Sequence, residues 1–331
     1  KLPKISNLNK INLNKVNILF SALPNGEAQK IAKKMPNNVR LIDLSADFRL
    51  GSAKLYHKWY GLNHKCKDLI SQSIYAITEF TKKELKNFKI ISCPGCYPTS
   101  IQIPLIPLVK KGMINYKNII IDSKSGYSGA GKNIKKKFNF KNLFNSVSAY
   151  GVGSHRHVAE IEQQLSIASK KKINVFFTPH LIPMFRGILS TIYLKTNKNN
   201  DAFKIYKFLK KYHKNNFFIK IAKFNTPIGT GDVMNTNYCQ ISVCKDRVKN
   251  KVIIIRNARR KNSFTNYKFL KKYENLLFIG LNDEYKVLKK EVPNLEYYDC
   301  KNFFEMAQII KSSKFFLGNL SFGYHIAEGL K

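Results

Sequence analysis

Short apolar runs separated by polar segments divide the chain into two differently built halves. In the first half the apolar runs cover 16–23, 40–45 and 89–93, and helical spacing follows the first of them at about 26–35. Strand, turn, helix and strand in this order are typical of a parallel sheet with helices packed on its faces. The pattern therefore predicts an α/β protein that begins with an incomplete parallel-sheet domain.

The segment 96–112 follows the third strand and has the composition of a buried helix. It begins at Cys96 and ends at Gly112, and Pro104 and Pro107 lie inside it. An internal proline removes a backbone donor and clashes with the preceding turn, so we expect a kink or a break there. A further apolar run at 118–123 predicts a strand.

The next segments indicate a mixed α+β domain. Residues 157–169 have helical spacing, whereas 174–183, 187–196 and 237–244 alternate apolar and polar positions. Such alternation is typical of an antiparallel sheet with one covered face. A polar break at 245–251 precedes a new apolar strand. We therefore expect three parts: an incomplete parallel-sheet domain over 1–96, an α+β domain with a mixed sheet over 97–248, and a C-terminal α/β segment over 249–331.

The charge of the chain is strongly positive, but its distribution does not indicate a specific nucleic-acid partner. The net charge is +38, and only eight of the 58 basic residues are arginines. The lysines are scattered, so we predict a solvated basic surface with weak, salt-sensitive binding to polyanions. No apolar run approaches the roughly 18 residues of a membrane span. Six cysteines without an export signal predict a reducing, cytoplasmic location.

The sequence ISCPGCYPTS contains two cysteines, Cys93 and Cys96, whose spacing fits a redox dithiol, half of a zinc site, or a single nucleophile. A zinc site needs a second pair, and Cys239 and Cys244 lie along one predicted strand, which suits a tetrahedral site poorly. We therefore predict no metal. Cys96 opens a helix, where backbone N–H groups and the helix dipole favour a thiolate. This position favours Cys96 as a nucleophile over the dithiol alternative.

A nucleophilic cysteine needs a group that moves its proton, and one histidine pair is well placed in the sequence. His155 and His157 flank Arg156, and Glu160 follows His157 by about one helical turn. A carboxylate near an imidazole orients the ring and sets its basicity. The same residues also fit an ordinary exposed helix start.

Two further segments carry candidate binding groups. The stretch 123–132 (SKSGYSGAGK) is rich in glycine and serine, and such turns expose N–H groups to phosphate. The stretch 177–188 contains His180, which fits a core histidine equally well, and Arg186. Arginine is the better bidentate partner for a carboxylate or a phosphate, so Arg186 is a candidate for an anionic group.

Together with LPNG and DLSADFRL, these motifs occur in an order and spacing that resemble N-acetyl-gamma-glutamyl-phosphate reductase over about residues 16–245. The resemblance implies a Rossmann domain followed by an α+β catalytic and dimerisation domain, as in aspartate-semialdehyde dehydrogenase. It implies NADPH-dependent reduction of N-acetyl-gamma-glutamyl phosphate to the 5-semialdehyde in arginine biosynthesis. An aminoadipyl or aspartyl phosphate is the alternative substrate. A homodimer or homotetramer is also implied.

The resemblance also implies roles for individual residues. Cys96 would attack the acyl phosphate and form a thioester, His155 would move the proton, and Glu160 would orient His155. His157 and Arg186 would contact the substrate. The residues expected to lie along NADP come from three turns: Pro24, Gly26, Ser45, Ser125, Gly126, Gly129 and Gly131.

The chain departs from the reductase pattern at both ends. No glycine-rich phosphate turn precedes residue 16, so we expect an uncovered apolar sheet face, low solubility and impaired activity. About residues 252–331 resemble part of a GT-B glycosyltransferase of the ADP-heptose:lipopolysaccharide type. The residues that carry this second resemblance are Gly318, Asn319, Ser321 and Glu328. A broken or fused gene is therefore favoured over a bifunctional enzyme.

Overall fold

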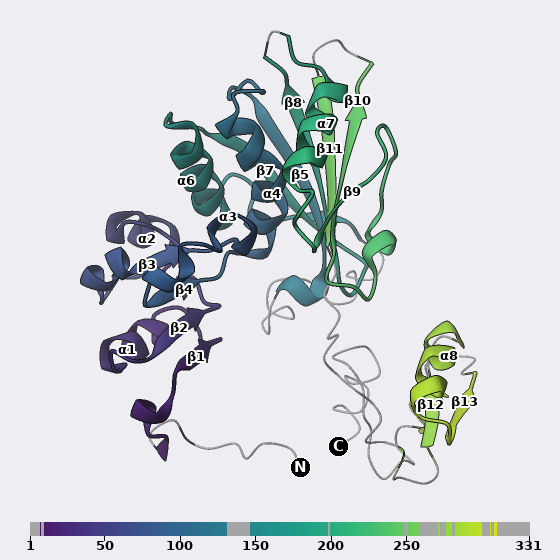
Figure 1. Ribbon diagram of the computed structural model, residues 1–331, viewed down its shortest axis with the longest axis horizontal. Coiled ribbons are helices and arrows are strands. Elements are labelled where there is room, and N and C mark those ends of the chain that lie inside the picture. Colours follow the sequence, from purple (N-terminus) through teal and green to yellow (C-terminus); the bar gives the residue numbers. More distant parts are fainter. Residues whose placement is uncertain are drawn as a thin grey trace. The chain divides into compact units, whose positions relative to one another are not determined.

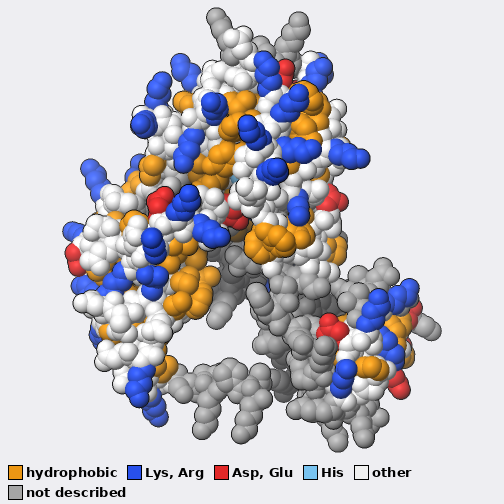
Figure 2. All heavy atoms as spheres, in the orientation of Figure 1, with side chains coloured by type: hydrophobic (Ala, Val, Ile, Leu, Met, Phe, Trp, Pro, Cys, Tyr) orange, Lys and Arg blue, Asp and Glu red, His pale blue; other side chains and the backbone are white. Residues whose placement is uncertain are grey.

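The computed structural model describes residues 7, 10–130, 146–197, 199–247, 251–258, 271, 276–279, 282–299, 305 and 308–309. The chain divides into two compact units, Lys1–Lys261 and Asn262–Lys331, and each is treated by itself. Within the described ranges, every helix is too short or too polar to span a bilayer. Figure 2 shows Lys and Arg side chains spread over the visible face rather than gathered in one stripe.

The first sheet of the larger unit has four parallel strands in the order β1-β2-β4-β3 (Figure 1). The strands are β1 (Ile18–Ser21), β2 (Arg40–Asp43), β3 (Ser73–Tyr75) and β4 (Ile90–Ser92). The helices that accompany them are α1 (Glu27–Lys34), α2 (Ala53–Tyr60) and the short α3 (Thr78–Thr81). The predicted parallel sheet is confirmed. Strand β3 was not predicted from the sequence, because it has only three residues.

One face of this sheet is covered and the other is partly open. Leu41 and Ile90 are fully buried in a cluster that includes Ala32 and Met35 from α1 and its end. On the opposite face of β1, Ile18 and Phe20 remain 53% and 68% exposed. The alternation of side chains along a strand puts these two residues on the same face. The uncovered apolar surface expected from the sequence is therefore present.

The second sheet has seven strands in the order β6-β7-β5-β8-β11-β10-β9, with both parallel and antiparallel pairs. Its strands are β5 (Ile119–Gly126), β6 (Ser148–Ala149), β7 (Val175–Ile182), β8 (Ile188–Lys195), β9 (Ile219–Ile221), β10 (Cys239–Lys245) and β11 (Lys251–Ala258). Helices pack on one face of it (Figure 1), namely α4 (Cys96–Lys110), α6 (His157–Ser169) and α7 (Ala202–Tyr212). The mixed sheet predicted from alternation is confirmed.

The strand β11 changes where the larger unit ends. It pairs with β8 on one side and with β10 on the other, so it is an inner strand of the seven-stranded sheet. The boundary expected at 248/249 lies before this strand, whereas the compact units divide between Lys261 and Asn262. A boundary at 248/249 would therefore separate two neighbouring strands of one sheet.

Helix α4 is continuous from Cys96 to Lys110 with both Pro104 and Pro107 inside it. The prolines do not break the helix, although each leaves one backbone carbonyl without its helical donor, and a kink at them stays a prediction. Twelve of the fifteen residues are buried, and burial of that much apolar surface outweighs two lost hydrogen bonds. The helix ends as predicted at Gly112, whose positive φ of 65° suits the left-handed position after a helix.

The smaller unit contains a parallel pair of strands, β12 (Leu276–Ile279) and β13 (Leu295–Tyr298), joined through helix α8 (Asn282–Glu291). This strand–helix–strand unit agrees with the expected α/β segment. The residues predicted to form a nucleotide-sugar site lie outside the described residues: Gly318, Asn319, Ser321 and Glu328.

Candidate active site

The candidate nucleophile lies where the first sheet delivers the chain to helix α4. Strand β4 ends at Ser92, the turn Cys93–Pro94–Gly95 follows, and Cys96 is the first residue of α4. The Cys96 side chain is exposed to solvent at this helix start. Its position is the one predicted from the sequence.

The surroundings of Cys96 shift the pKa of its thiol upward. The largest cause is desolvation by the surrounding protein, and the negative charge of Glu160 acts in the same direction. The backbone N–H groups of Tyr97 and Cys96 and the positive charge of Arg49 act in the opposite direction. The N–H groups at the helix start thus favour the thiolate, as expected, but burial outweighs them. A group that accepts the proton is needed when Cys96 reacts.

Two imidazoles lie at the start of α4. The rings of His155 and His157 are 4.8 Å apart between centroids, and both meet the ring of Tyr97 edge-on at 5.6 Å and 5.9 Å. The backbone N–H of His157 donates to Nδ1 of His155 at 3.2 Å. While Nδ1 accepts this hydrogen bond, neutral His155 carries its hydrogen on Nε2.

The ring of His157 lies directly against Gly95. A Cβ atom at position 95 would be 2.5 Å from Nε2 of His157, so only glycine allows this approach. Burial, with smaller contributions from Arg49 and Arg156, lowers the pKa of His157 to about 3. His157 is consequently neutral at physiological pH and offers a hydrogen bond rather than a charge to an anionic substrate.

Glu160 is fully buried and bonds to groups that the sequence did not connect with it. Its carboxylate accepts hydrogen bonds from Arg49 Nη1 at 3.1 Å, from Gly95 N at 2.9 Å and from the Tyr75 hydroxyl at 3.1 Å. The imidazole near it is that of His157, at 3.9 Å from Nε2. Glu160 thus supports the turn before Cys96, and its role in orienting His155 stays a prediction.

A buried set of hydroxyl groups continues from the site beneath α4. The hydroxyls of Tyr97 and Tyr150 are 3.0 Å apart. Further along the sheet, Ser190 Oγ lies 2.7 Å from Ser100 Oγ and 2.7 Å from Ser123 Oγ, as part of the buried core. Ser125, at the end of β5, is likewise buried.

The glycine-rich turn after β5 is held against the segment that carries Arg186. Gly126 N donates to Gly187 O and Tyr127 N donates to Met184 O, both at 2.9 Å. A Cβ at position 126 would lie 2.6 Å from the Met184 and Phe185 carbonyl oxygens, which explains the glycine. The Arg186 guanidinium lies 5.2 Å from the centre of the Phe185 ring.

The structure thus brings the described residues of this turn, which were predicted from the sequence, next to the segment that carries Arg186. Gly129 follows in the short turn of Tyr127–Ala130, where a Cβ would be 4.0 Å from Ser125 Oγ and meet no obstacle. Gly131 lies outside the described residues.

The predicted cofactor residues of the first sheet are bound into its loops. Gly26 N donates to both oxygens of Asp47, at 2.7 Å and 2.9 Å, and the Ser45 hydroxyl donates to Asp43 at 2.9 Å. Pro24 is exposed just before Gly26. The Asp47 carboxylate therefore occupies the start of α1 that would otherwise attract a phosphate.

The carboxyl edge of this sheet fits the uncharged part of a dinucleotide. Leu23 and Leu44 are exposed just beyond β1 and β2, where flat apolar rings dock in such sheets. The hydroxyls of Ser21 and Ser92, at the ends of β1 and β4, are buried without a hydrogen-bond partner in the described part of the chain. These residues fit a nicotinamide and its ribose, whereas the phosphates need donors other than Gly26.

Sequence analysis missed several residues that shape the site, of which Arg49 is the most prominent. It belongs to DLSADFRL and is one of only eight arginines among the 58 basic residues, a signal that could have pointed to it. No group of three or more His, Cys, Asp or Glu side chains within the described ranges could hold a metal ion.

Two family models match the chain, one for each sheet. Residues 3–88 match the semialdehyde dehydrogenase NAD binding domain, and residues 96–258 match the semialdehyde dehydrogenase dimerisation domain. Among solved structures, aspartate semialdehyde dehydrogenase II from Vibrio cholerae superimposes with a TM-score of 0.58 at 15% identity, over 77% of each chain. This similarity concerns the fold.

Curated relatives are more similar in sequence. The chain is 40% identical over 255 residues to the probable chloroplastic N-acetyl-gamma-glutamyl-phosphate reductase of Arabidopsis thaliana, and the match covers 77% of this chain and 64% of that relative. It is 42% identical over 255 residues to N-acetyl-gamma-glutamyl-phosphate reductase of Ehrlichia ruminantium (strain Gardel), over 76% and 73% of the two chains. The chain thus spans less than two thirds of the plant relative.

Proposed function

The chain belongs to the N-acetyl-gamma-glutamyl-phosphate reductase family, and from this premise we propose that it reduces N-acetyl-gamma-glutamyl phosphate to N-acetylglutamate 5-semialdehyde. The observation that carries the proposal is the exposed Cys96 thiol at the first residue of a buried helix, beside two imidazoles. The proposed cofactor is NADPH, in keeping with the matched NAD binding domain.

In the proposed reaction, Cys96 attacks the acyl carbon of the substrate. His155 is the proposed acceptor of the thiol proton, which it takes on the unprotonated nitrogen of its neutral ring to become an imidazolium. The bond from carbon to the phosphate oxygen breaks, phosphate leaves, and a thioester forms on Cys96. When bound, NADPH supplies the hydride that reduces the thioester carbon.

The tetrahedral oxygen that results needs donors, and the N–H groups at the start of α4 lie next to the sulfur. His155 returns a proton as the carbon–sulfur bond breaks and the aldehyde leaves. Arg186 is the proposed partner of an anionic group of the substrate, and neutral His157 contributes a hydrogen bond. The proposed cofactor contacts remain Pro24, Gly26, Ser45, Ser125, Gly126, Gly129 and Gly131.

The test is the phosphate-dependent reverse reaction, followed by the absorbance of reduced nicotinamide. The protein is supplied with NADP⁺, phosphate and, in turn, the semialdehydes of N-acetylglutamate, aminoadipate and aspartate. We expect turnover with the first, its loss in Cys96→Ala and its retention in Cys93→Ala. Preference for another semialdehyde would support the alternative substrate, and full turnover in Cys96→Ala would overturn the proposal.

A homodimer through the open face of the seven-stranded sheet is the proposed assembly. Ile120, Phe176 and Tyr193 stand in one row across three strands and are 46%, 63% and 39% exposed. Such a row of large apolar side chains favours burial against a second copy. Light scattering should give the mass of a dimer, and Phe176→Lys should shift it toward the monomer.

For residues beyond 258 the glycosyltransferase resemblance stays a prediction, as does a cytoplasmic location. The strand at 252–258 belongs to the seven-stranded sheet and not to a separate nucleotide-sugar domain. We expect no binding of ADP-sugars by the whole chain in calorimetry; micromolar binding would reverse this expectation.

A further inference from the structure

Arg49 uses every nitrogen of its guanidinium group in the core of the larger unit. Nε donates to Cys93 O at 2.8 Å, Nη1 donates to Glu160 Oε1 at 3.1 Å, and Nη2 donates to Leu44 O at 3.0 Å. Only 11% of its side chain is exposed. A planar fork with fixed donor directions can make three such bonds at once, which a lysine ammonium cannot reproduce.

The three partners of Arg49 come from different elements that meet at the nucleophile. Leu44 follows the end of β2, Cys93 follows the end of β4, and Glu160 lies in the first turn of α6. Arg49 therefore joins the carboxyl edge of the parallel sheet to a helix that packs on the mixed sheet. Arg49 and Glu160 are 111 residues apart in the sequence.

Arg49 and Glu160 together hold both ends of the turn that precedes Cys96. Arg49 binds the carbonyl of Cys93, and Glu160 Oε2 accepts from the amide of Gly95 at 2.9 Å. The two side chains also bind each other, so both ends of the turn are held by one connected pair. Cys96 is the next residue after this turn, so the Arg49–Glu160 pair sets the position of its backbone.

We propose that Arg49 is a positioning residue which, paired with Glu160, holds the Cys93–Gly95 turn and sets both the place and the electrostatic surroundings of the Cys96 thiol. This inference rests on the proposed role of Cys96 as nucleophile. It assigns Arg49 no contact with substrate. Glu160 takes the same positioning role.

A buried ion pair could also serve stability alone, and the two roles have different signatures. The charges of Arg49 and Glu160 act on the thiol in opposite directions, because a cation favours the thiolate and an anion opposes it. A purely structural pair would loosen the site in the same way whichever partner was changed. The charged or titratable groups near Cys96 are Arg49, Glu160, His155, His157, Tyr97 and Tyr150.

The experiment measures the rate of Cys96 alkylation by iodoacetamide against pH, with the modified peptide quantified by mass spectrometry. The variants are Arg49→Gln, Glu160→Gln and the double variant. We expect the midpoint of the pH profile to rise in the first and to fall in the second. A midpoint that moves by one on the pH scale changes the alkylation rate at neutral pH about tenfold. In the double variant the midpoint of the pH profile should return toward that of the unmodified protein.

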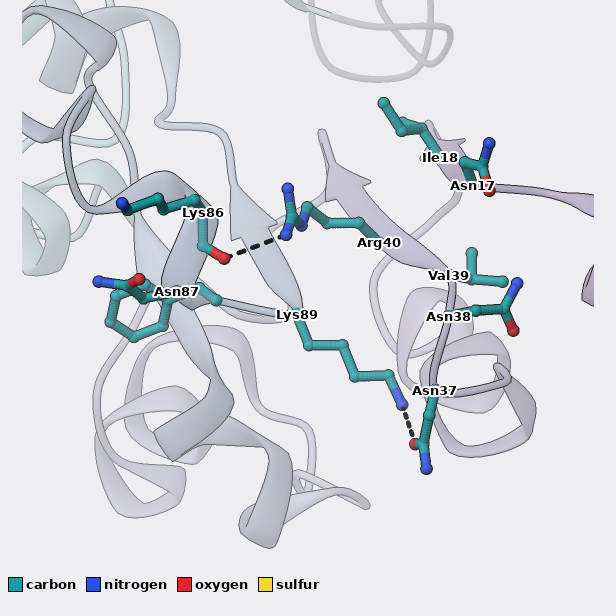
Figure 3. Close-up of a pocket in the computed structure, with 10 residues that line it drawn as sticks. Asn17, Ile18, Asn37, Asn38, Val39, Arg40, Lys86, Asn87 and Lys89 are labelled. Atoms are coloured by element: carbon teal, nitrogen blue, oxygen red, sulfur yellow. Dashed lines mark hydrogen bonds between the residues drawn. The ribbon is translucent and has the colours of Figure 1, made fainter.

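The matched control is Arg40→Gln at the other end of β2. Figure 3 shows Arg40 reaching across an open pocket to the Lys86 carbonyl, to which Nη2 donates at 3.0 Å. It is also an arginine bound to a backbone oxygen, but it is exposed and lies away from Cys96. Its alkylation profile should match the unmodified protein. Midpoints that move in the same direction in both single variants, or that move no further than in the control, would overturn the proposal.

If a single variant fails to fold by circular dichroism, Arg49→Lys answers the same question. It keeps the charge but cannot make three directed bonds, so the alkylation midpoint should hold while turnover falls at unchanged KM. An unchanged turnover would overturn the positioning role. The alkylation readout needs no substrate, so failure of the inference is distinguishable from failure of the proposed reaction.

Discussion

Gly95→Ala tests the contact that places His157 against the turn before the nucleophile. Gly95 has φ −64° and ψ 159°, which alanine adopts without strain, so any effect comes from the added methyl group. That Cβ would lie 2.5 Å from Nε2, 2.8 Å from Cδ2 and 2.9 Å from Cε1 of His157. An ordinary contact begins near 3.4 Å, so the ring must retreat by about 0.9 Å (3.4 − 2.5).

A displacement near 1 Å within a reacting constellation costs roughly 10²-fold in turnover. Overpacking of this kind also costs about 1–3 kcal/mol of stability, or about 2–4 °C of melting temperature per kcal/mol for a domain of this size. The assays are the reverse reaction and a thermal melt. Gly51→Ala is the control, since its Cβ would meet only Gln163 Oε1 at 3.7 Å. Equal turnover and melting temperature in the two variants would refute the placement of His157.

Three further changes test other parts of the molecule. Gly126→Ala should lower the melting temperature, because its Cβ would meet backbone atoms at 2.6 Å, whereas Gly129→Ala should leave the melting temperature unchanged; a thermal melt checks both. Ser190→Ala removes the shared hydroxyl partner of Ser123 and should cost about 1–3 kcal/mol in urea unfolding. Burial lowers the pKa of His213 to about 4, so the folded protein keeps it neutral while the unfolded chain protonates it near 6.5. Stability present above pH 6.5 should therefore be lost as pH falls toward 4, by about 2 kcal/mol at pH 5, and His213→Asn should flatten that slope in urea unfolding; an unchanged slope would contradict it.

The parts of the fold that follow from local pattern were predictable from the sequence. Alternation along β7, β8 and β10 reports which face of a strand is covered, and the position of Cys96 follows from a strand that ends where a helix begins. The glycines at 112 and 126 mark positions where a side chain does not fit. These features are encoded within a few residues of where they act.

The partners of Glu160 were not predictable, because they depend on tertiary packing. Its bonds to Arg49, Tyr75 and Gly95 join residues that are 111, 85 and 65 positions away. Sequence spacing offered the nearby histidines instead, and the structure gives His157 only a long contact. The continuity of α4 through its prolines likewise reflects burial by distant strands, which no local rule contains.

Helix α4 has a consequence for how such an enzyme could change during evolution. The Cys96 sulfur, the proposed nucleophile, stands at the start of a helix whose other residues are almost all buried, so it cannot shift without disturbing the core. New specificities must then arise in the segments that approach the sulfur from outside, such as 126–129 and 184–187. Selection would leave the helix almost untouched while those loops diverge, and a library that randomises the loops alone should retain folded, thiol-reactive members.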